Sequence, residues 1–198
     1  MPEKPDLAAL LGSRICHDLI SPIGAIGNGL ELLMMDGNVS GPEMALISES
    51  VANANARIRF FRVAYGLAQV EQRIGRAEVV SILTDLTRGG RLQIDWQTGP
   101  DLGRGDVKIV FLLIQCLENA MAYGGKVSIT TADGRWLITG QANKLKINTA
   151  LWEVLVNPAA APDITPAQVQ FPLVADEIAR QSHRLTAELS EAQIKLSF

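Results

Sequence analysis

The stretch SRICHDLISPIGAI occupies residues 13–26 and runs on into GLELL at residues 29–33. Its apolar positions recur at steps of four, three, four and three, at Leu19, Ile23, Ile26, Leu30 and Leu33. This spacing predicts a helix whose apolar stripe packs against other helices. His17 precedes the stripe by two residues, which is about 200° around a helix. The sequence therefore predicts a buried stripe and a histidine that faces solvent.

A surface or capping histidine is the plain alternative for His17. Three features favour a chemical role: His17 is one of two histidines, it lies inside the helical pattern, and the acidic Asp18 follows it. Pro22 cannot donate a hydrogen bond to the carbonyl of Asp18, so a kink is predicted just beyond the histidine. We interpret His17 as a functional residue.

The segment HDLISP at residues 17–22, followed by GLELL, resembles the phospho-acceptor box of two-component histidine kinases. The longer version SRICHDLISP more closely resembles the ChpT-type histidine phosphotransferases. In that family a dimeric helical hairpin carries a phosphohistidine relay, and a kinase-like C-terminal domain has lost ATP binding. The resemblance implies that His17 is the phospho-acceptor.

Composition narrows the class of protein. The 198 residues are 47% hydrophobic, which is typical of a globular chain with a substantial core. A net charge of −3 gives no electrostatic reason to expect nucleic acid or an anionic membrane as a partner. Cys16 and Cys116 lie far apart in the sequence and are expected to be buried or half-buried free thiols. With no apolar run of 18 residues and no signal peptide, we expect a cytoplasmic protein.

The first 70 residues predict two long helices. The first runs from about Leu7 to Met34, with Asp6 able to cap it. The second begins with Ser40 as N-cap and Glu43 completing a capping box. Its apolar seam steps by three and four through Met44, Ile47, Val51, Ala54, Ile58, Phe61, Tyr65 and Ala68. A short loop joins the helices into an antiparallel hairpin.

Such a hairpin leaves apolar surface uncovered, because both helices carry further apolar residues outside their seams. A second copy of the chain would cover that surface. We therefore expect a homodimer through residues 7–70 that forms a four-helix bundle. The family resemblance implies the same assembly independently.

The remainder predicts a mixed domain after a linker at residues 69–76. Helices are expected at 77–86, 106–123, 150–156 and 167–183, with a loop at 158–166. Strands are expected at 91–96, 127–131, 136–138, 185–189 and 193–198, with a hairpin turn at Asp133-Gly134. The fold class is α+β, with a sheet covered by helices on one face. The expected domains are 1–73 and 74–198, and the resemblance makes the second a degenerate histidine-kinase-like (Bergerat-type) α/β sandwich.

ATP binding is the property that separates a kinase from a transfer protein. The segment LIQCLENAMAY at residues 113–123 resembles the kinase helix whose asparagine, here Asn119, holds magnesium on ATP. The kinase motif Asp-x-Gly-x-Gly is missing between Gly134 and Pro166, and QVQFPL at residues 168–173 replaces the phosphate-binding Gly-x-Gly loop. We expect no ATP binding, with Asn119 marking a vestigial nucleotide pocket or merely bracing its helix. His183 is expected to suit a helix C-terminus.

The resemblance implies partners and a mechanism. The partners are receiver domains of response regulators and hybrid kinases, which bring their own Mg²⁺, so no metal or tightly bound cofactor is expected in this chain. His17 would accept the phosphoryl group, since a good fraction of histidine is neutral at pH 7. Supporting candidates share positions within one turn of His17. They are Asp18, Ser21 and Arg14 for catalysis, and Ile20 and Ser13 for partner docking.

Two alternatives stay open for these residues. A non-catalytic dimeric adaptor or inhibitor would bind receiver domains or a kinase without needing His17. A true ATP-dependent histidine kinase would label itself from ATP. Arg14 can equally be an ordinary solvated arginine, and helical geometry does not assure a contact between the adjacent His17 and Asp18.

Overall fold

The computed structural model describes residues 6–36, 41–157, 160 and 162–198. Six α-helices are described, α1 Leu7–Asp36, α2 Pro42–Ala64, α3 Arg76–Thr87, α4 Arg104–Ala120, α5 Thr149–Val154 and α6 Gln170–Arg180, with a 3₁₀ turn η1 at Pro166–Gln168. The described strands are β1 Arg73–Gly75, β2 Leu92–Gln97, β3 Asp101–Gly103, β4 Gly125–Ala132, β5 Arg135–Gln141, β6 Thr186–Leu189 and β7 Gln193–Ser197. No helix in these ranges is both long and apolar enough to span a bilayer.

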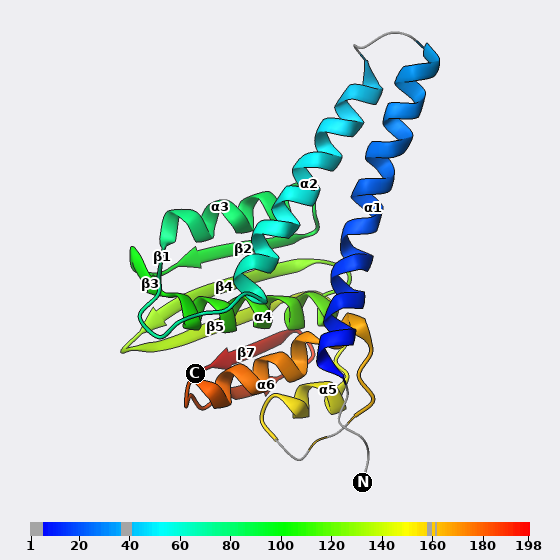
Figure 1. Cartoon of the computed structure of the whole chain (residues 1–198). Coiled ribbons are helices and arrows are strands. Elements are labelled where there is room, and N and C mark those ends of the chain that lie inside the picture. The colour runs from blue at the N-terminus through cyan, green and yellow to red at the C-terminus, as the bar shows by residue number, and fades with distance from the viewer. Residues whose placement is uncertain (1–5, 37–40, 158–159, 161) are drawn as a thin grey trace.

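The predicted hairpin is confirmed: α1 and α2 are long antiparallel neighbours that rise from the rest of the molecule (Figure 1). The Asp6 carboxylate accepts hydrogen bonds from the amides of Ala8 and Ala9, as expected of an N-cap. The N-cap of α2 is Gly41, without a side-chain cap, and the predicted cap Ser40 lies outside the described residues. The second helix ends at Ala64 rather than near Ala68.

The predicted apolar seams are only partly covered within one chain. Ile23 and Leu30 of α1 are 58% and 51% exposed, and Val51 and Ile58 of α2 are 41% and 44% exposed. At Gly29 the helices approach so closely that a Cβ there would lie 2.6 Å from Ile47 Cγ1. The contact line between the helices therefore runs through the buried Pro22 and Gly29 and not through Ile23 and Leu30. The predicted stripe is wrong by one residue at these two positions.

A five-stranded sheet of order β2-β4-β5-β7-β6 forms the other half of the molecule. β2 pairs parallel with β4, and the remaining pairs are antiparallel. The predicted turn at Asp133-Gly134 is confirmed, with φ of 51° and 74° as a tight two-residue hairpin requires. Buried and exposed residues alternate along β5, so one face of the sheet meets the helices and the other faces solvent.

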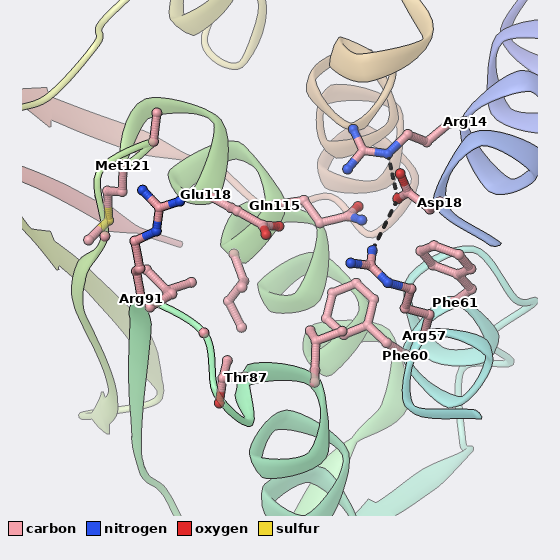
Figure 2. Close-up of a pocket in the computed structure, with 16 residues that line it drawn as sticks. Arg14, Asp18, Arg57, Phe60, Phe61, Thr87, Arg91, Gln115, Glu118 and Met121 are labelled. Atoms are coloured by element: carbon pink, nitrogen blue, oxygen red, sulfur yellow. Dashed lines mark hydrogen bonds and ion pairs between the residues drawn. The ribbon is translucent and has the colours of Figure 1, made fainter. Parts of the chain in front are cut away.

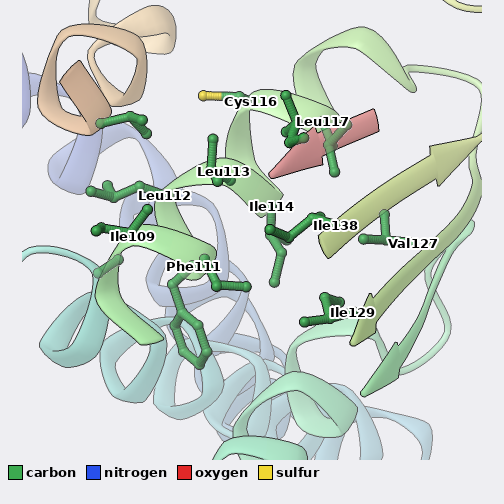
Figure 3. Close-up of a cluster of buried hydrophobic side chains, with 14 of the residues drawn as sticks. Ile109, Phe111, Leu112, Leu113, Ile114, Cys116, Leu117, Val127, Ile129 and Ile138 are labelled. Atoms are coloured by element: carbon green, nitrogen blue, oxygen red, sulfur yellow. The ribbon is translucent and has the colours of Figure 1, made fainter. Parts of the chain in front are cut away.

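Helix α4 lies at the centre of the hydrophobic core, where its apolar side chains meet those of the sheet, such as Val127, Ile129 and Ile138 (Figure 3). The base of α2 belongs to the same core, because Phe60 stacks on Phe111 of α4 with ring centroids 4.8 Å apart. The hairpin and the sheet are thus joined by packing as well as by the chain. The predicted boundary between residues 73 and 74 falls within β1.

Two expectations outside the hairpin are wrong in detail. Residues 69–76 are not a plain linker, because they contain β1, which pairs antiparallel with the unexpected β3. The predicted final helix at 167–183 is instead η1 followed by α6. Ser182 adopts φ 57° beyond the end of α6, and the amides of Ser182 and His183 bond back to the carbonyls of Ala179 and Ile178. This is the Schellman arrangement that stops a helix.

Candidate functional site

His17 lies on α1 with its side chain 85% exposed, so the predicted outward orientation is confirmed. Its Nδ1 lies 3.2 Å from Asp18 Oδ1, a contact between neighbouring residues that helical periodicity does not anticipate. No residue in the described part of the chain hydrogen-bonds Nε2. The ring therefore presents one tethered nitrogen and one nitrogen open to solvent.

Asp18 is the connection between this ring and the interior. Its side chain is 10% exposed, and its Oδ2 accepts a hydrogen bond from Arg14 Nε at 2.8 Å. A guanidinium nitrogen of Arg57, on α2, lies 3.8 Å from the same oxygen (Figure 2). Two cations from two helices thus contact this carboxylate and fix its direction.

The sequence allowed Arg14 to be an ordinary solvated arginine, but the structure shows that it is not. Its side chain is 16% exposed, and a second guanidinium nitrogen donates to the Ala167 carbonyl at 2.9 Å. Because Ala167 belongs to η1, Arg14 ties the hairpin to a segment 153 residues away. Arg14 holds Asp18 and Ala167 rather than pointing into solvent beside His17.

A second set of polar contacts braces the same junction. Tyr65 Oη, just after α2, donates to Gln115 Oε1 of α4 at 2.8 Å. Burial raises the pKa of Tyr65 to about 12, so the phenol stays protonated as a donor. Gln170, buried in the first turn of α6, donates to the Ala167 carbonyl at 3.1 Å. Tyr65 thus links the end of the hairpin to α4, and Arg14 and Gln170 share the Ala167 carbonyl just before α6.

The remaining predicted residues lie at different places. Ser13, Ile20 and Ser21 are exposed on α1 around His17, with Ile20 70% exposed. Asn119 is exposed near the end of α4, away from the polar groups just described. His183 is beyond α6, where its Nε2 lies 3.1 Å from Asp106 Oδ1 and its ring packs against Phe198. Cys16 is exposed, contrary to expectation, whereas Cys116 is buried.

A cavity of about 240 Å³ lies directly behind Asp18, between the base of the hairpin, the segment after α3, and α4 (Figure 2). Arg57, Arg91, Gln115 and Glu118 contribute polar groups to its wall, and Asn119 does not line it. Glu118 keeps some contact with solvent, but the crowding of protein atoms around its carboxyl raises its pKa, against the opposing effect of Arg14 and Arg57. No group of three or more potential metal ligands occurs among the residues that the structure describes.

Sequence reasoning missed Arg57 and Glu118. Arg57 follows Ala54 by three residues and precedes Phe61 by four, so the seam spacing itself carried the signal that its side chain lies toward the first helix. Glu118 sits beside Asn119 in the kinase-like segment, and only the packing of α2 against α4 brings it to the cavity. No local pattern indicated that contact.

Comparison with known proteins identifies the family. Residues 76–193 match the model of the histidine phosphotransferase C-terminal domain. The chain is also 35% identical over 164 residues to protein phosphotransferase ChpT of Brucella abortus (strain 2308), which covers 80% of this chain and 77% of that protein. The chain belongs to the ChpT-type histidine phosphotransferases. A solved structure of a bacterial phosphotransferase, 32% identical, superposes with a TM-score of 0.81 over 97% of this chain and 95% of that one.

The family model of this ChpT-type protein covers the α/β part of the chain and not the hairpin. The match begins at Arg76, the first residue of α3, so His17 lies outside it. The structural match covers both the hairpin and the sheet, which makes the hairpin part of the shared fold. The role of His17 must therefore be argued from the geometry of the hairpin itself.

Proposed function

We propose that this phosphotransferase works in a phosphorelay by accepting a phosphoryl group on His17 from a receiver-domain aspartate and passing it to another receiver domain. The observation that carries the proposal is the state of the His17 ring, which is 85% exposed while its Nδ1 is tethered to a shielded carboxylate. An exposed imidazole can be reached by a large partner, and a tethered one has a defined direction. A histidine retained for packing would need neither property.

The contact with Asp18 selects the reacting nitrogen. If Nδ1 carries the proton and donates it to Asp18 Oδ1, the lone pair of the neutral ring is on Nε2. Nε2 attacks the phosphorus of the aspartyl phosphate in line. The N–P bond forms, the bond between phosphorus and the acyl oxygen breaks, and the receiver carboxylate leaves with that electron pair. The positive charge that develops on the ring is stabilised by Asp18.

Asp18 and Arg14 act as positioning residues in this proposal. Arg14, with Arg57, holds the Asp18 carboxylate in the direction of Nδ1. Because Arg14 also donates to the Ala167 carbonyl, this part of α1 is anchored to the α/β part of the chain beside Asp18. Phosphoryl transfer depends mostly on such positioning and on charge neutralisation.

The partner surface is assigned to the exposed residues around His17. Ile20 offers an apolar contact, and Ser13 and Ser21 offer hydroxyls on neighbouring turns of α1. Receiver domains of response regulators and hybrid kinases would supply the phosphoryl group, its Mg²⁺ and a lysine. The proposed setting is the cytoplasm, with neither nucleic acid nor membrane as a partner.

Assembly into a homodimer follows from the uncovered stripes of the hairpin. Ile23 and Leu30 of α1, with Val51 and Ile58 of α2, are large apolar residues that one chain leaves 41–58% exposed. Packing of two hairpins into a four-helix bundle through residues 7–70 would bury them. The proposed division is a dimerisation and transfer unit at 1–73 and a kinase-like unit at 74–198.

The kinase-like unit is proposed to lack ATP binding and therefore autokinase activity. At the start of α6, where a kinase has its glycine-rich phosphate loop, Gln170 and Phe171 are 1% and 0% exposed and fill the space with side chains. Asn119 is left as a remnant of the ancestral pocket. Formation of phosphohistidine from ATP alone would contradict this part of the proposal.

The test is phosphoryl transfer from a phosphorylated receiver domain. The wild type should become labelled, and His17→Ala should abolish labelling because the nucleophile is gone. His183→Ala is the matched control, since His183 is the second of the two histidines and should leave labelling intact. Receiver binding that is unchanged by His17→Ala, without any phosphohistidine in the wild type, would instead indicate a non-catalytic adaptor.

A further inference from the structure

The cavity behind Asp18 has the features of a binding site that phosphotransfer does not use. It measures about 240 Å³, and its wall is built by α1, α2, α4 and the end of α3 with the following loop (Figure 2). Drug-sized sites span about 300–1,000 Å³, so this cavity suits a smaller ligand, on the order of ten non-hydrogen atoms. His17 points to solvent and does not line it.

An amide donor with no hydrogen bond to a described residue faces this cavity. Gln115 is 4% exposed, and its side chain extends from α4 toward Asp18 and Arg57 (Figure 2). Its Oε1 accepts the Tyr65 hydroxyl, but its amide nitrogen donates to no described residue. The amide nitrogen of Gln115 is thus free to bind an acceptor inside the cavity.

The charges around the cavity favour an anion. Three arginines line it, Arg14, Arg57 and Arg91, against two acidic residues, Asp18 and Glu118. Asp18 is already paired with Arg14 at 2.8 Å. The crowding of protein atoms around the Glu118 carboxyl raises its pKa. The guanidinium of Arg91 has no hydrogen bond or ion pair within the part of the chain that the structure describes, so it is available to a ligand.

The rest of the wall is apolar. Phe60 of α2, Leu86 of α3 and Ile114 of α4 share it with the polar groups. A ligand that satisfies both parts carries one anionic group, placed toward Arg91, and a compact apolar group against the aromatic and aliphatic side chains. We propose that this cavity binds a small organic anion, a carboxylate or phosphate ester with an apolar substituent.

Phenyl phosphate is the probe that tests this proposal. The full-length ¹⁵N-labelled protein is titrated with it, and amide shifts are followed by NMR. We expect saturable shifts in residues 86–92 and 114–122, with a Kd of about 1 mM or lower for a ligand of this size. Phenol and inorganic phosphate each present half of the required chemistry and should bind about tenfold more weakly. This readout does not depend on phosphotransfer to His17.

Variants of Arg91 decide whether the assigned wall is responsible. Arg91→Ala should raise the Kd for phenyl phosphate about tenfold, and Arg91→Lys should recover most of the binding because the charge remains. Arg88→Ala is the matched control, since Arg88 lies three residues away, is paired with Asp85 and does not line the cavity. Absence of saturable shifts in the wild type, or equal Kd values for Arg91→Ala and Arg88→Ala, would overturn the proposal. So would phenol or phosphate binding as tightly as phenyl phosphate.

Discussion

Replacement of Asp18 by asparagine tests the link between His17 and the interior. Asparagine has nearly the same shape and keeps an oxygen that can accept the Nδ1 proton, but it carries no charge. The change therefore isolates the electrostatic part of the Asp18 role. Loss of the negative charge changes the energy of the neutral ring little and destabilises the imidazolium that develops during transfer. The barrier to transfer should therefore rise.

The size of the effect follows from the exposure of the two partners. A hydrogen bond to a charged group contributes about 1.5–3 kcal/mol when shielded, and an exposed ion pair about 0–1 kcal/mol. His17 is 85% exposed and Asp18 is 10% exposed, so an intermediate value of about 1 kcal/mol is appropriate. A loss of about 1 kcal/mol in transition-state stabilisation slows labelling about fivefold. Stability should fall too, by about 2 kcal/mol, since Arg14 loses its charged partner.

The assay is the single-turnover rate of His17 labelling from a phosphorylated receiver, measured by rapid quench well below the Tm of the variant. Asp85→Asn is the control, because Asp85 also accepts from two arginines, Arg59 at 2.8 Å and Arg88 at 2.7 Å, but lies on α3 away from His17. Asp85→Asn should be labelled at the wild-type rate. Folded Asp18→Asn that is labelled as fast as the wild type, or equal slowing in both variants, would refute the reasoning.

Three further predictions concern assembly and stability. Leu30→Glu should convert the proposed dimer to a 21.4 kDa monomer in light scattering, because each leucine buried in the interface contributes about 1.5–3 kcal/mol. Leu137→Glu, on the solvent face of the sheet, is the control and should leave the dimer intact. A Leu30→Glu variant that stays dimeric would contradict the four-helix bundle. Glu177 is 6% exposed, and although burial alone would raise its pKa, Arg180, Gln181 and Lys108 hold it below the ordinary value. Glu177→Gln should therefore cost about 2–4 kcal/mol in chemical denaturation at neutral pH, with a gap to the wild type that closes as acid protonates the carboxylate. The pKa of Glu118 is shifted in the opposite direction, upward, so its ionisation at high pH disfavours the folded state. Glu118→Gln should therefore raise the Tm at pH 7 and have no effect on it below about pH 4. A lower Tm for Glu118→Gln at pH 7 would contradict this.

The sequence was sufficient for features that depend on local spacing. The apolar stripe beside His17 placed the ring on the solvent side of α1, and the structure has it there. Asp133-Gly134 marked the hairpin turn because both residues tolerate positive φ. The α+β class and the order of the main helices and strands likewise follow from periodicity and turn residues.

Features that depend on tertiary packing or on unusual backbone were not predictable in the same way. β1 and β3 are three residues each, which is too short to show the alternation of apolar and polar residues that predicts a strand. They are strands because they pair with each other. Ser182 takes the left-handed conformation that glycine usually supplies, so no glycine marked the end of α6. The close approach at Gly29 shifted the contact line of α1 by one residue.

The supporting groups of the site were the hardest to foresee. His17 and Asp18 are adjacent in the sequence, but the groups that fix Asp18 come from α2 and, through Arg14, from the Ala167 carbonyl 153 residues away. A carbonyl oxygen carries no sequence signature at all. Arg57 could have been placed from the seam, whereas Glu118 required the packed arrangement of α2 on α4.

The attachment atom of the phosphoryl group tests the central claim most directly. The full-length protein is labelled from a phosphorylated receiver domain and examined by ³¹P NMR, with peptide mapping to locate the modified residue. A single phosphohistidine at His17, bonded through Nε2, is the predicted result, because Nδ1 is held by Asp18. A phosphoryl group on Nδ1, or on any residue other than His17, would contradict the account.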